Sequence, residues 1–278
     1  MRFAANHGRR WRLALPLCAV AVVLFRGSPA TAQSGASTGQ SESESSAKSL
    51  LDRGVRAYNA GNSSLAQVIF RQAAALGDVD AMMYLGVMYG TGRGVDVDYA
   101  SAMAWFRRAA DAGNSQAMCN IGLLYYQGLG TAKSYSQAMS WFLKAASFNN
   151  AEATFNVGVL HRDGLGAPVN YVEAMSWFRK AAGEGDIPSA NAIGVLYQQG
   201  LGVSVDYAQA MSWYQNAAAA GSDAAMYNIG VLWEGGLGVA QDRGQAIDWY
   251  RKAAAAGNDA AKAALKSLGA QEAAPQLP

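Results

Sequence analysis

Apolar residues recur along the chain with a period of 36 residues. In each period a short apolar stretch surrounds a glycine, and a second stretch carries a tryptophan, an aromatic residue and an alanine pair. The glycines are Gly86, Gly122, Gly158, Gly194 and Gly230, and the tryptophans are Trp105, Trp141, Trp177, Trp213 and Trp249. Apolar positions three and four residues apart indicate one face of an α-helix. The pattern therefore predicts five units of two helices each, over about 79–90 and 99–112 in the first unit and the equivalent residues of the others.

Polar residues that favour helix ends separate the apolar stretches. A glycine, or Asn149 in one unit, directly precedes an N-cap residue at Asp78, Asn114, Asn150, Asp186, Ser222 and Asn258. This pair predicts that one helix ends in a left-handed residue and that the next begins at once. A second set of N-caps stands at Asp98, Ser134, Asn170, Asp206 and Asp242, and a Gly-x-Gly turn precedes each of them. These turns lie between two helices, which is the wrong context for a phosphate-binding loop.

The same pattern predicts an all-α fold and the limits of the array. The repeats extend over 48–268, with a degenerate first pair at 48–78, full repeats at 79–258 and a capping helix at 259–268. In the first pair Ile69 replaces the tryptophan and the connecting loop is about four residues shorter. Residues 33–47 are rich in Ser, Gln and Glu, so we expect a flexible linker there and a flexible tail at 269–278.

Residues 1–32 have the features of a secretory signal peptide. A basic stretch precedes an apolar run from Leu13 to Phe25, and Ala30 and Ala32 provide small residues for cleavage after Ala32. We therefore expect a periplasmic or secreted protein with no membrane insertion after cleavage. The apolar run is shorter than the roughly 20 residues that span a bilayer. A retained leader acting as a membrane anchor is the alternative.

Charge and composition narrow the function further. The chain has 22 basic and 20 acidic residues, and the leader holds five arginines and no acid, so the mature chain has 17 basic against 20 acidic residues. This slight negative charge argues against nucleic acid as a partner. Outside the leader the chain has one cysteine, Cys119, and one histidine, His161. We therefore assign no catalytic residue, no metal ligand and no cofactor.

The repeated residues resemble the Sel1-like repeat, a relative of the tetratricopeptide repeat. The resemblance rests on Leu85-Gly86, Tyr89, Gly92, Gly94-Val95, Asp98, Ala102, Trp105-Phe106, Ala109-Ala110 and Gly113, and it recurs through residue 258. It implies a right-handed superhelical solenoid of antiparallel helix pairs that serves as an adaptor surface for other proteins, often in the bacterial cell envelope. The cysteine-rich branch of the family ties its helix pairs with disulfides, and this chain lacks those cysteines.

Positions that differ between the repeats are candidates for partner binding. If the first helix of each repeat lines the concave surface, as the resemblance implies, residues three before and four or five after each central glycine point into the groove. The predicted groove residues are Met83, Tyr126, Phe155, Arg162, Asn191, Gln198, Tyr227 and Glu234. Aromatic and amide side chains with a few charges suit a protein or peptide partner, although an ordinary solvated surface has the same composition. The aliphatic residues after the glycines would form an apolar floor, namely Val87, Leu123, Val159, Val195 and Val231.

Positions shared by all repeats are explained by packing. The tryptophans, alanine pairs and central glycines fall in this class, and truncating one tryptophan to alanine should cost about 3–5 kcal/mol. His161 stands where other repeats have Tyr or Trp, which favours a packing role. Cys119 falls among the groove positions, as a semi-buried thiol or an intermolecular disulfide partner. Basic residues recur near the ends of the second helices, where they complement the helix dipole: Arg108, Lys144, Lys180 and Lys252.

These observations favour a non-enzymatic periplasmic or secreted adaptor or regulator, which we expect to be a monomer. It would bind a partner protein or peptide in its groove. The first alternative is a cell-envelope hydrolase that acts on wall fragments through Asp163 and Glu234. The second is a structural role through end-to-end association of the repeats.

Overall fold

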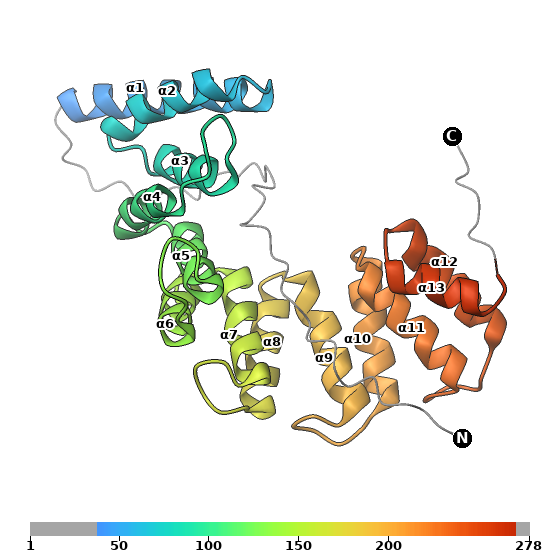
Figure 1. Ribbon diagram of the computed structural model, residues 1–278. Helices are drawn as coiled ribbons and strands as arrows, with labels where there is room; N and C mark the ends of the chain where they lie inside the picture. The colour runs from blue at the N-terminus through green and yellow to red at the C-terminus, as the bar shows by residue number, and fades with distance from the viewer. Residues whose placement is uncertain (1–37, 271–278) are drawn as a thin grey trace. The chain divides into compact units, whose positions relative to one another are not determined.

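The computed structural model describes residues 38–270 (Figure 1). Over these residues the chain forms 13 α-helices and no β-strand, so the predicted all-α repeat fold is confirmed. The helices before residue 134, which form unit 1, are α1 (Thr38–Asn59), α2 (Ser63–Ala75), α3 (Val79–Thr91), α4 (Tyr99–Asp111) and α5 (Ser115–Gln127). In unit 2 they are α6 (Tyr135–Ala146), α7 (Ala151–Asp163), α8 (Tyr171–Gly183), α9 (Ile187–Gln199), α10 (Tyr207–Ala219), α11 (Asp223–Gly235), α12 (Arg243–Ala255) and α13 (Asp259–Ser267). The predicted signal peptide, residues 33–37 of the linker and residues 271–278 of the tail lie outside the described residues.

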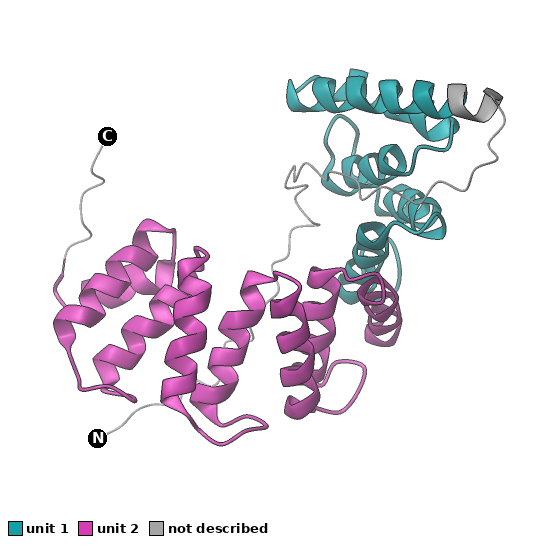
Figure 2. Ribbon diagram, turned by 180° about the vertical axis from the view of Figure 1, so that it is seen from behind, with its two compact units in different colours: residues 1–133 teal, residues 134–278 magenta. Residues whose placement is uncertain are grey.

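The chain divides into two compact units, residues 1–133 and residues 134–278 (Figure 2). In unit 1 each of the helices α1 to α5 packs on the next one in the chain. In unit 2 the same holds from α6 to α13. Within each unit the helices thus pack on their neighbours in the sequence, which is the packing of a repeat array.

The predicted caps set the helix ends. The side chain of Asp98 accepts hydrogen bonds of 3.0 Å from the backbone N–H groups of Ala100 and Ser101. The first helices of the full repeats end at glycines in the left-handed region, for example Gly92 with φ 71°. Asn149 has φ 56° and is the one non-glycine residue with positive φ among residues 38–270. The backbone N–H of Asp98 donates to the carbonyl of Tyr89 in the last turn of α3, so α4 starts beside the end of α3 and the pair is antiparallel.

The first helix pair differs from the prediction at its start. The helix α1 begins at Thr38, so residues 38–47 are helical rather than part of a linker, and Ala47 is buried. Serine, glutamate and glutamine are compatible with a helix once packed residues further along have nucleated it. The short loop is as predicted, since residues 60–62 connect α1 to α2 where residues 92–98 connect α3 to α4.

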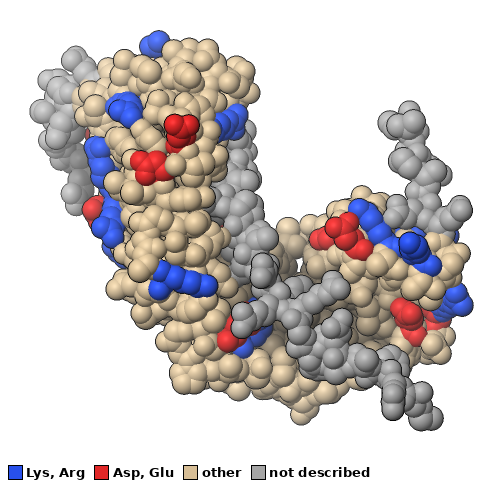
Figure 3. All heavy atoms as spheres, in the orientation of Figure 1, with Lys and Arg blue, Asp and Glu red and all other residues tan. Residues whose placement is uncertain are grey.

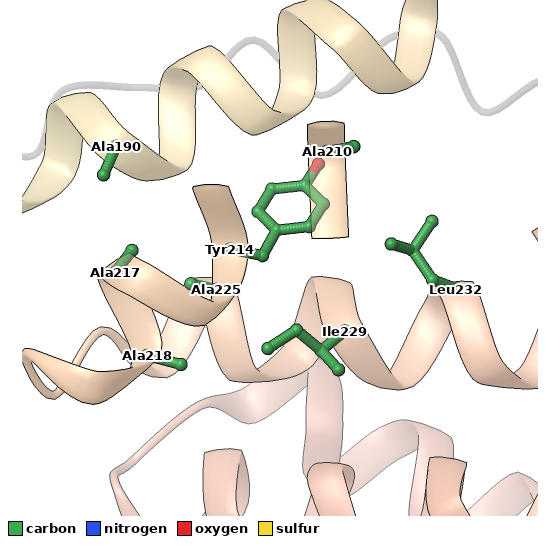
Figure 4. Close-up of a cluster of buried hydrophobic side chains, with 8 residues drawn as sticks. All are labelled: Ala190, Ala210, Tyr214, Ala217, Ala218, Ala225, Ile229 and Leu232. Atoms are coloured by element: carbon green, nitrogen blue, oxygen red, sulfur yellow. The ribbon is translucent and has the colours of Figure 1, made fainter. Parts of the chain in front are cut away.

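Central glycines allow the two helices of a repeat to approach closely. In unit 2 the ring of Tyr214 lies between helices, within a cluster formed mainly by alanines (Figure 4). A Cβ at Gly194 would lie 2.5 Å from Cε1 of that ring. Phe178 and Tyr250 occupy the same place over Gly158 and Gly230. These aromatic residues are fully buried, whereas the preceding tryptophans are half-buried.

Four of the five second-helix tryptophans have a cation over the ring. The guanidinium of Arg108 lies 4.4 Å from the ring centroid of Trp105, and Lys252 Nζ lies 4.0 Å from that of Trp249. Lys144 and Lys180 lie 5.0 and 5.3 Å from Trp141 and Trp177. The recurring cations therefore stack on tryptophan, in addition to lying near the helix C-terminus.

The second glycine of each Gly-x-Gly turn makes a contact between repeats. A Cβ at Gly202 would lie 2.8 Å from the backbone carbonyl carbon of Tyr171, in the first turn of α8. Gly166 contacts Tyr135 and Gly238 contacts Tyr207 in the same way. The turn thus joins two helices and also packs against the second helix of the repeat before it.

The last described helix differs from the first helices of full repeats. Arg243 in the first turn of α12 stands where α10 has Tyr207. It donates a 2.6 Å hydrogen bond to the carbonyl of Leu268, at the C-cap of α13. Lys266 stands at the central glycine position and is exposed, as expected for a capping helix. None of the helices within residues 38–270 has the length and apolar character that a bilayer crossing requires.

Candidate functional site

Six of the eight predicted groove residues lie in unit 2, on the first helices of three successive repeats. Phe155 and Arg162 are on α7, Asn191 and Gln198 are on α9, and Tyr227 and Glu234 are on α11. We call these six positions the first-helix face. The other two, Met83 on α3 and Tyr126 on α5, are half-buried in unit 1.

Two aromatic residues of the face are held by the second helix of their own repeat. The ring centroid of Phe155 lies 5.4 Å from that of buried Phe178, and the centroid of Tyr227 lies 5.5 Å from that of buried Tyr250. Phe155 and Tyr227 themselves are half-buried. One side of each ring is therefore fixed by packing while part of it stays accessible to solvent.

The residues four after the central glycines accept hydrogen bonds from buried tyrosines. The Tyr214 hydroxyl donates to Oε1 of Gln198 at 2.5 Å, and the Tyr250 hydroxyl donates to Oε2 of Glu234 at 2.6 Å. Burial raises the pKa of both tyrosines, and at Tyr250 the bond to Glu234 and its charge raise it further. In the repeat of α7 and α8, the second-helix residue is Phe178 and the first-helix residue is Arg162. The residue four after the glycine is thus a hydrogen-bond acceptor in the two repeats whose second helix carries a buried tyrosine, and it is an arginine where that residue is phenylalanine.

Asn191 does not point freely into a groove. It is buried, with 8% of its surface exposed, and its Oδ1 accepts a 2.9 Å hydrogen bond from Nδ2 of Asn228 on α11. The same link occurs in unit 1, where Nδ2 of Asn120 lies 3.6 Å from the sulfur of Met83. An asparagine two residues before the central glycine therefore connects neighbouring first helices. The spacing of 37 residues between partners is the signal that sequence reasoning missed.

Arg162 is bound to its neighbour Asp163. Its Nε lies 2.7 Å from Oδ1 and its Nη2 lies 2.9 Å from Oδ2. Only 17% of the Arg162 side chain and 32% of the Asp163 side chain are exposed. Asp163 and Glu234, the carboxylates considered for a hydrolase, lie on α7 and α11 with the α9 repeat between them. The structure thus does not bring them together as an acid and base pair.

The predicted apolar floor is mostly covered. Val87, Leu123 and Val159 are at most 2% exposed, so they belong to the core rather than to a binding surface. Val195 and Val231 are half-buried and lie on the same helices as the face. The accessible part of the floor is therefore confined to α9 and α11.

His161 stands at a position where other repeats have a tyrosine that is bonded to an arginine of the preceding repeat. Nη2 of Arg107 donates to the Tyr125 hydroxyl at 3.0 Å, and Arg179 donates to Tyr197 at 2.8 Å, 18 residues apart in both cases. In the repeat before that of His161, the residue at the arginine position is Leu143. His161 is half-buried at the position that these tyrosines occupy in the other repeats.

Cys119 is fully buried, with 0% of its surface exposed. The expectation that it is a semi-buried groove residue or an intermolecular disulfide partner is therefore wrong for this conformation. No group of three or more His, Cys, Asp or Glu residues within 38–270 is arranged to hold a metal ion.

Acidic residues gather where α8 ends and α9 begins. Asp186 is the N-cap of α9, and its Oδ2 accepts bonds from the backbone N–H and the hydroxyl of Ser189 at 2.8 and 2.5 Å. Burial raises the pKa of Asp186 to about 6, and repulsion from Glu152 and Glu184 adds to this in spite of the Ser189 bonds. Lys180 Nζ lies 3.8 Å from Oε1 of Glu184, while Oε2 of Glu184 is buried without a hydrogen-bond partner in the described structure.

Charged groups cover little of the visible surface. Figure 3 shows lysine, arginine, aspartate and glutamate separated by wide areas of other residues. Charged residues make up 15% of the chain.

Comparison with known proteins identifies the repeats. The Sel1 repeat family matches residues 79–114, 115–147, 151–186, 187–222 and 223–258. A Sel1 repeat protein from Oxalobacter formigenes is 34% identical with a TM-score of 0.74, and the match covers 78% of this chain and 89% of that one. Comparison with curated proteins gives no match.

Two further solved structures are similar. The c5321 protein, a protective antigen present in uropathogenic Escherichia coli strains, is 31% identical with a TM-score of 0.69, over 81% of this chain. This chain spans about half of that protein, 49% of its length. Pseudomonas aeruginosa pilF shares the fold at 18% identity, with a TM-score of 0.59 over 83% of this chain and 99% of that one.

These similarities and the 36-residue helix pairs lead to one conclusion. The chain belongs to the Sel1 repeat family, whose solenoids are non-catalytic scaffolds and generally mediate protein–protein interactions.

Proposed function

We propose that this protein is an exported adaptor that holds a segment of a partner protein on the first-helix face of unit 2. Export rests on the signal-peptide features of residues 1–32. The description of the related c5321 protein as a protective antigen supports a location accessible from outside the cell.

The observation that carries the proposal is the arrangement of Phe155 and Tyr227. Each is a half-buried ring fixed against a buried aromatic residue of the second helix, with centroids 5.4 and 5.5 Å apart. A ring that is already immobilised loses little conformational freedom when a partner covers it. Aromatic anchors of this kind account for much of the binding energy in protein interfaces.

The surroundings of the two rings suit an extended segment. Between α7 and α11 lies α9, which presents half-buried Val195 and the side-chain amide of Gln198. Val231 adds an apolar side chain next to Tyr227 on α11. Apolar contact areas alternating with amide groups can take side chains and backbone amides of a bound peptide in turn.

The test is crosslinking and affinity capture in the envelope of the source cell, followed by measuring the affinity of the captured protein. The protein would be compared with a Phe155→Ala/Tyr227→Ala variant and with a Leu143→Ala/Phe148→Ala variant. The control residues are also apolar and are 40% and 53% exposed, but they are not on the face.

We expect the partner to be lost from the Phe155/Tyr227 variant and kept by the Leu143/Phe148 variant, with both variants folded by circular dichroism. Equal capture by all three proteins would show that the first-helix face is not the binding surface.

A further inference from the structure

Glu234 carries a charge that the fold does not compensate. It is half-buried on α11, and its Oε2 accepts the 2.6 Å bond from Tyr250. The ion pairs within residues 38–270 do not include it, so no lysine or arginine of this part of the chain neutralises its carboxylate. Partial burial of an unpaired carboxylate is unfavourable.

The preceding repeat shows that the charge is not needed for the tyrosine. Gln198 stands at the same place on α9 and accepts the equivalent bond from Tyr214 at 2.5 Å. A neutral amide therefore satisfies a buried tyrosine hydroxyl in this setting. The negative charge of Glu234 has no function within the described fold that a glutamine would not fill.

The other charged residue of the face is paired within the chain, since Arg162 forms two hydrogen bonds with Asp163. A partner would therefore find paired charges at the α7 end of the face and a single unpaired carboxylate at the α11 end.

We propose that Glu234 is a specificity position that binds a lysine or arginine side chain of the partner segment. This inference rests on the proposed function. The cation supplies the counter-charge that the chain lacks, while Phe155 and Tyr227 contact apolar side chains of the same segment. The occupant is thus an extended, mainly apolar peptide with a basic residue at its α11 end.

The experiment selects peptides from a random display library on the protein produced from the full-length sequence. Four forms are compared: the parent, Glu234→Gln, Gln198→Glu and Phe155→Ala/Tyr227→Ala. Gln198 provides the precedent that Glu234→Gln keeps the bond to Tyr250, and thermal unfolding confirms that each form is folded. The affinity of a selected peptide is then measured at low and high salt.

We expect the parent to enrich peptides with aromatic or aliphatic residues and one lysine or arginine. Glu234→Gln should keep the apolar preference but lose the basic one, with binding of the selected peptide weakened about 10-fold at low salt and less dependent on salt. Gln198→Glu should add a preference for a second basic residue.

Other outcomes separate the two proposals. Peptides that need Phe155 and Tyr227 but show no basic preference, or one unchanged in Glu234→Gln, would overturn the role of Glu234 and leave the adaptor function standing. If no peptide is selected, or if binding is indifferent to Phe155 and Tyr227, both proposals are contradicted.

Discussion

The ring of Tyr214 lies directly on the backbone of Gly194, so that a Cβ added to the glycine would be 2.5 Å from Cε1 of the ring. The two residues belong to α9 and α10, the helices of one repeat. The same relationship recurs between the central glycines and the buried aromatic residues of other repeats, for example Gly158 and Phe178. This close contact between the ring and the glycine backbone explains why the repeats carry a glycine on the first helix and an aromatic residue on the second.

Replacing Gly194 by alanine should destabilise the protein in spite of the better helix propensity of alanine. Tyr214 is fully buried and cannot move away freely, so we expect a loss of about 1–3 kcal/mol from overpacking. Gly183→Ala in α8 is the matched control, because nothing lies within 4 Å of its added Cβ. It should be neutral or stabilising by up to about 1 kcal/mol in urea unfolding. Similar losses for both variants would disprove the argument.

Gly202 should be more sensitive to substitution than Gly221, although both have a positive φ, of 72° and 92°. An alanine at Gly202 would meet the backbone of Tyr171 at 2.8 Å, whereas one at Gly221 would meet nothing within 4 Å. Both variants pay for the left-handed conformation, roughly 1 kcal/mol. We expect Gly202→Ala to lose a further 1–3 kcal/mol, about the cost of overpacking, in chemical denaturation. Equal losses would mean that the contact between repeats does not constrain the turn.

Phe178 should contribute more stability than Trp177, although tryptophan is the most visible residue of the repeat. Phe178 is 0% exposed and lies under both Gly158 and Phe155, whereas Trp177 is half-buried with Lys180 over its ring. We expect Phe178→Ala to cost about 3–5 kcal/mol and Trp177→Ala less, because part of the indole already contacts water. A larger loss for Trp177→Ala in thermal unfolding would contradict this order.

The joint between α8 and α9 should lose stability as the pH rises through 6. The pKa of Asp186 is raised from 3.8 to about 6, chiefly by burial, so folding favours its protonated form. Its contribution is fully present below about pH 4 and is lost above the folded pKa, a change on the order of 3 kcal/mol. Asp186→Asn should flatten the profile of unfolding free energy between pH 4 and pH 7 while keeping the cap, since Asn150 caps α7.

Asp98 provides the control of opposite sign. Hydrogen bonds from Ser101 lower the pKa of Asp98, so its contribution is present at neutral pH and is lost as the pH falls through the lowered value. Asp98→Asn should therefore change stability mainly at neutral pH. Parallel pH profiles for the parent and the Asp186→Asn variant would contradict the assignment at the α8–α9 joint.

The sequence by itself determined the helices and their limits. The first two full-repeat helices, predicted over about 79–90 and 99–112, are Val79–Thr91 and Tyr99–Asp111, and the predicted N-caps at Asp78 and Asp98 are present. Capping depends on hydrogen bonds between residues two to four positions apart, so the local sequence is sufficient to predict it. The start of α1 was missed because polar residues 38–47 have no apolar pattern, and the helix there continues from a packed segment.

The tertiary structure alone decided which variable residues face a partner and which face the protein. Asn191 and Gln198 vary between repeats like binding residues, yet they bond to Asn228 and Tyr214 on other helices, 37 and 16 residues away. Glu234 differs from Gln198 by one charge in the same kind of bond. Variation between repeats shows which positions the common repeat packing does not require. A hydrogen bond between two helices depends on how those helices pack, and the sequence of one helix alone does not determine that packing.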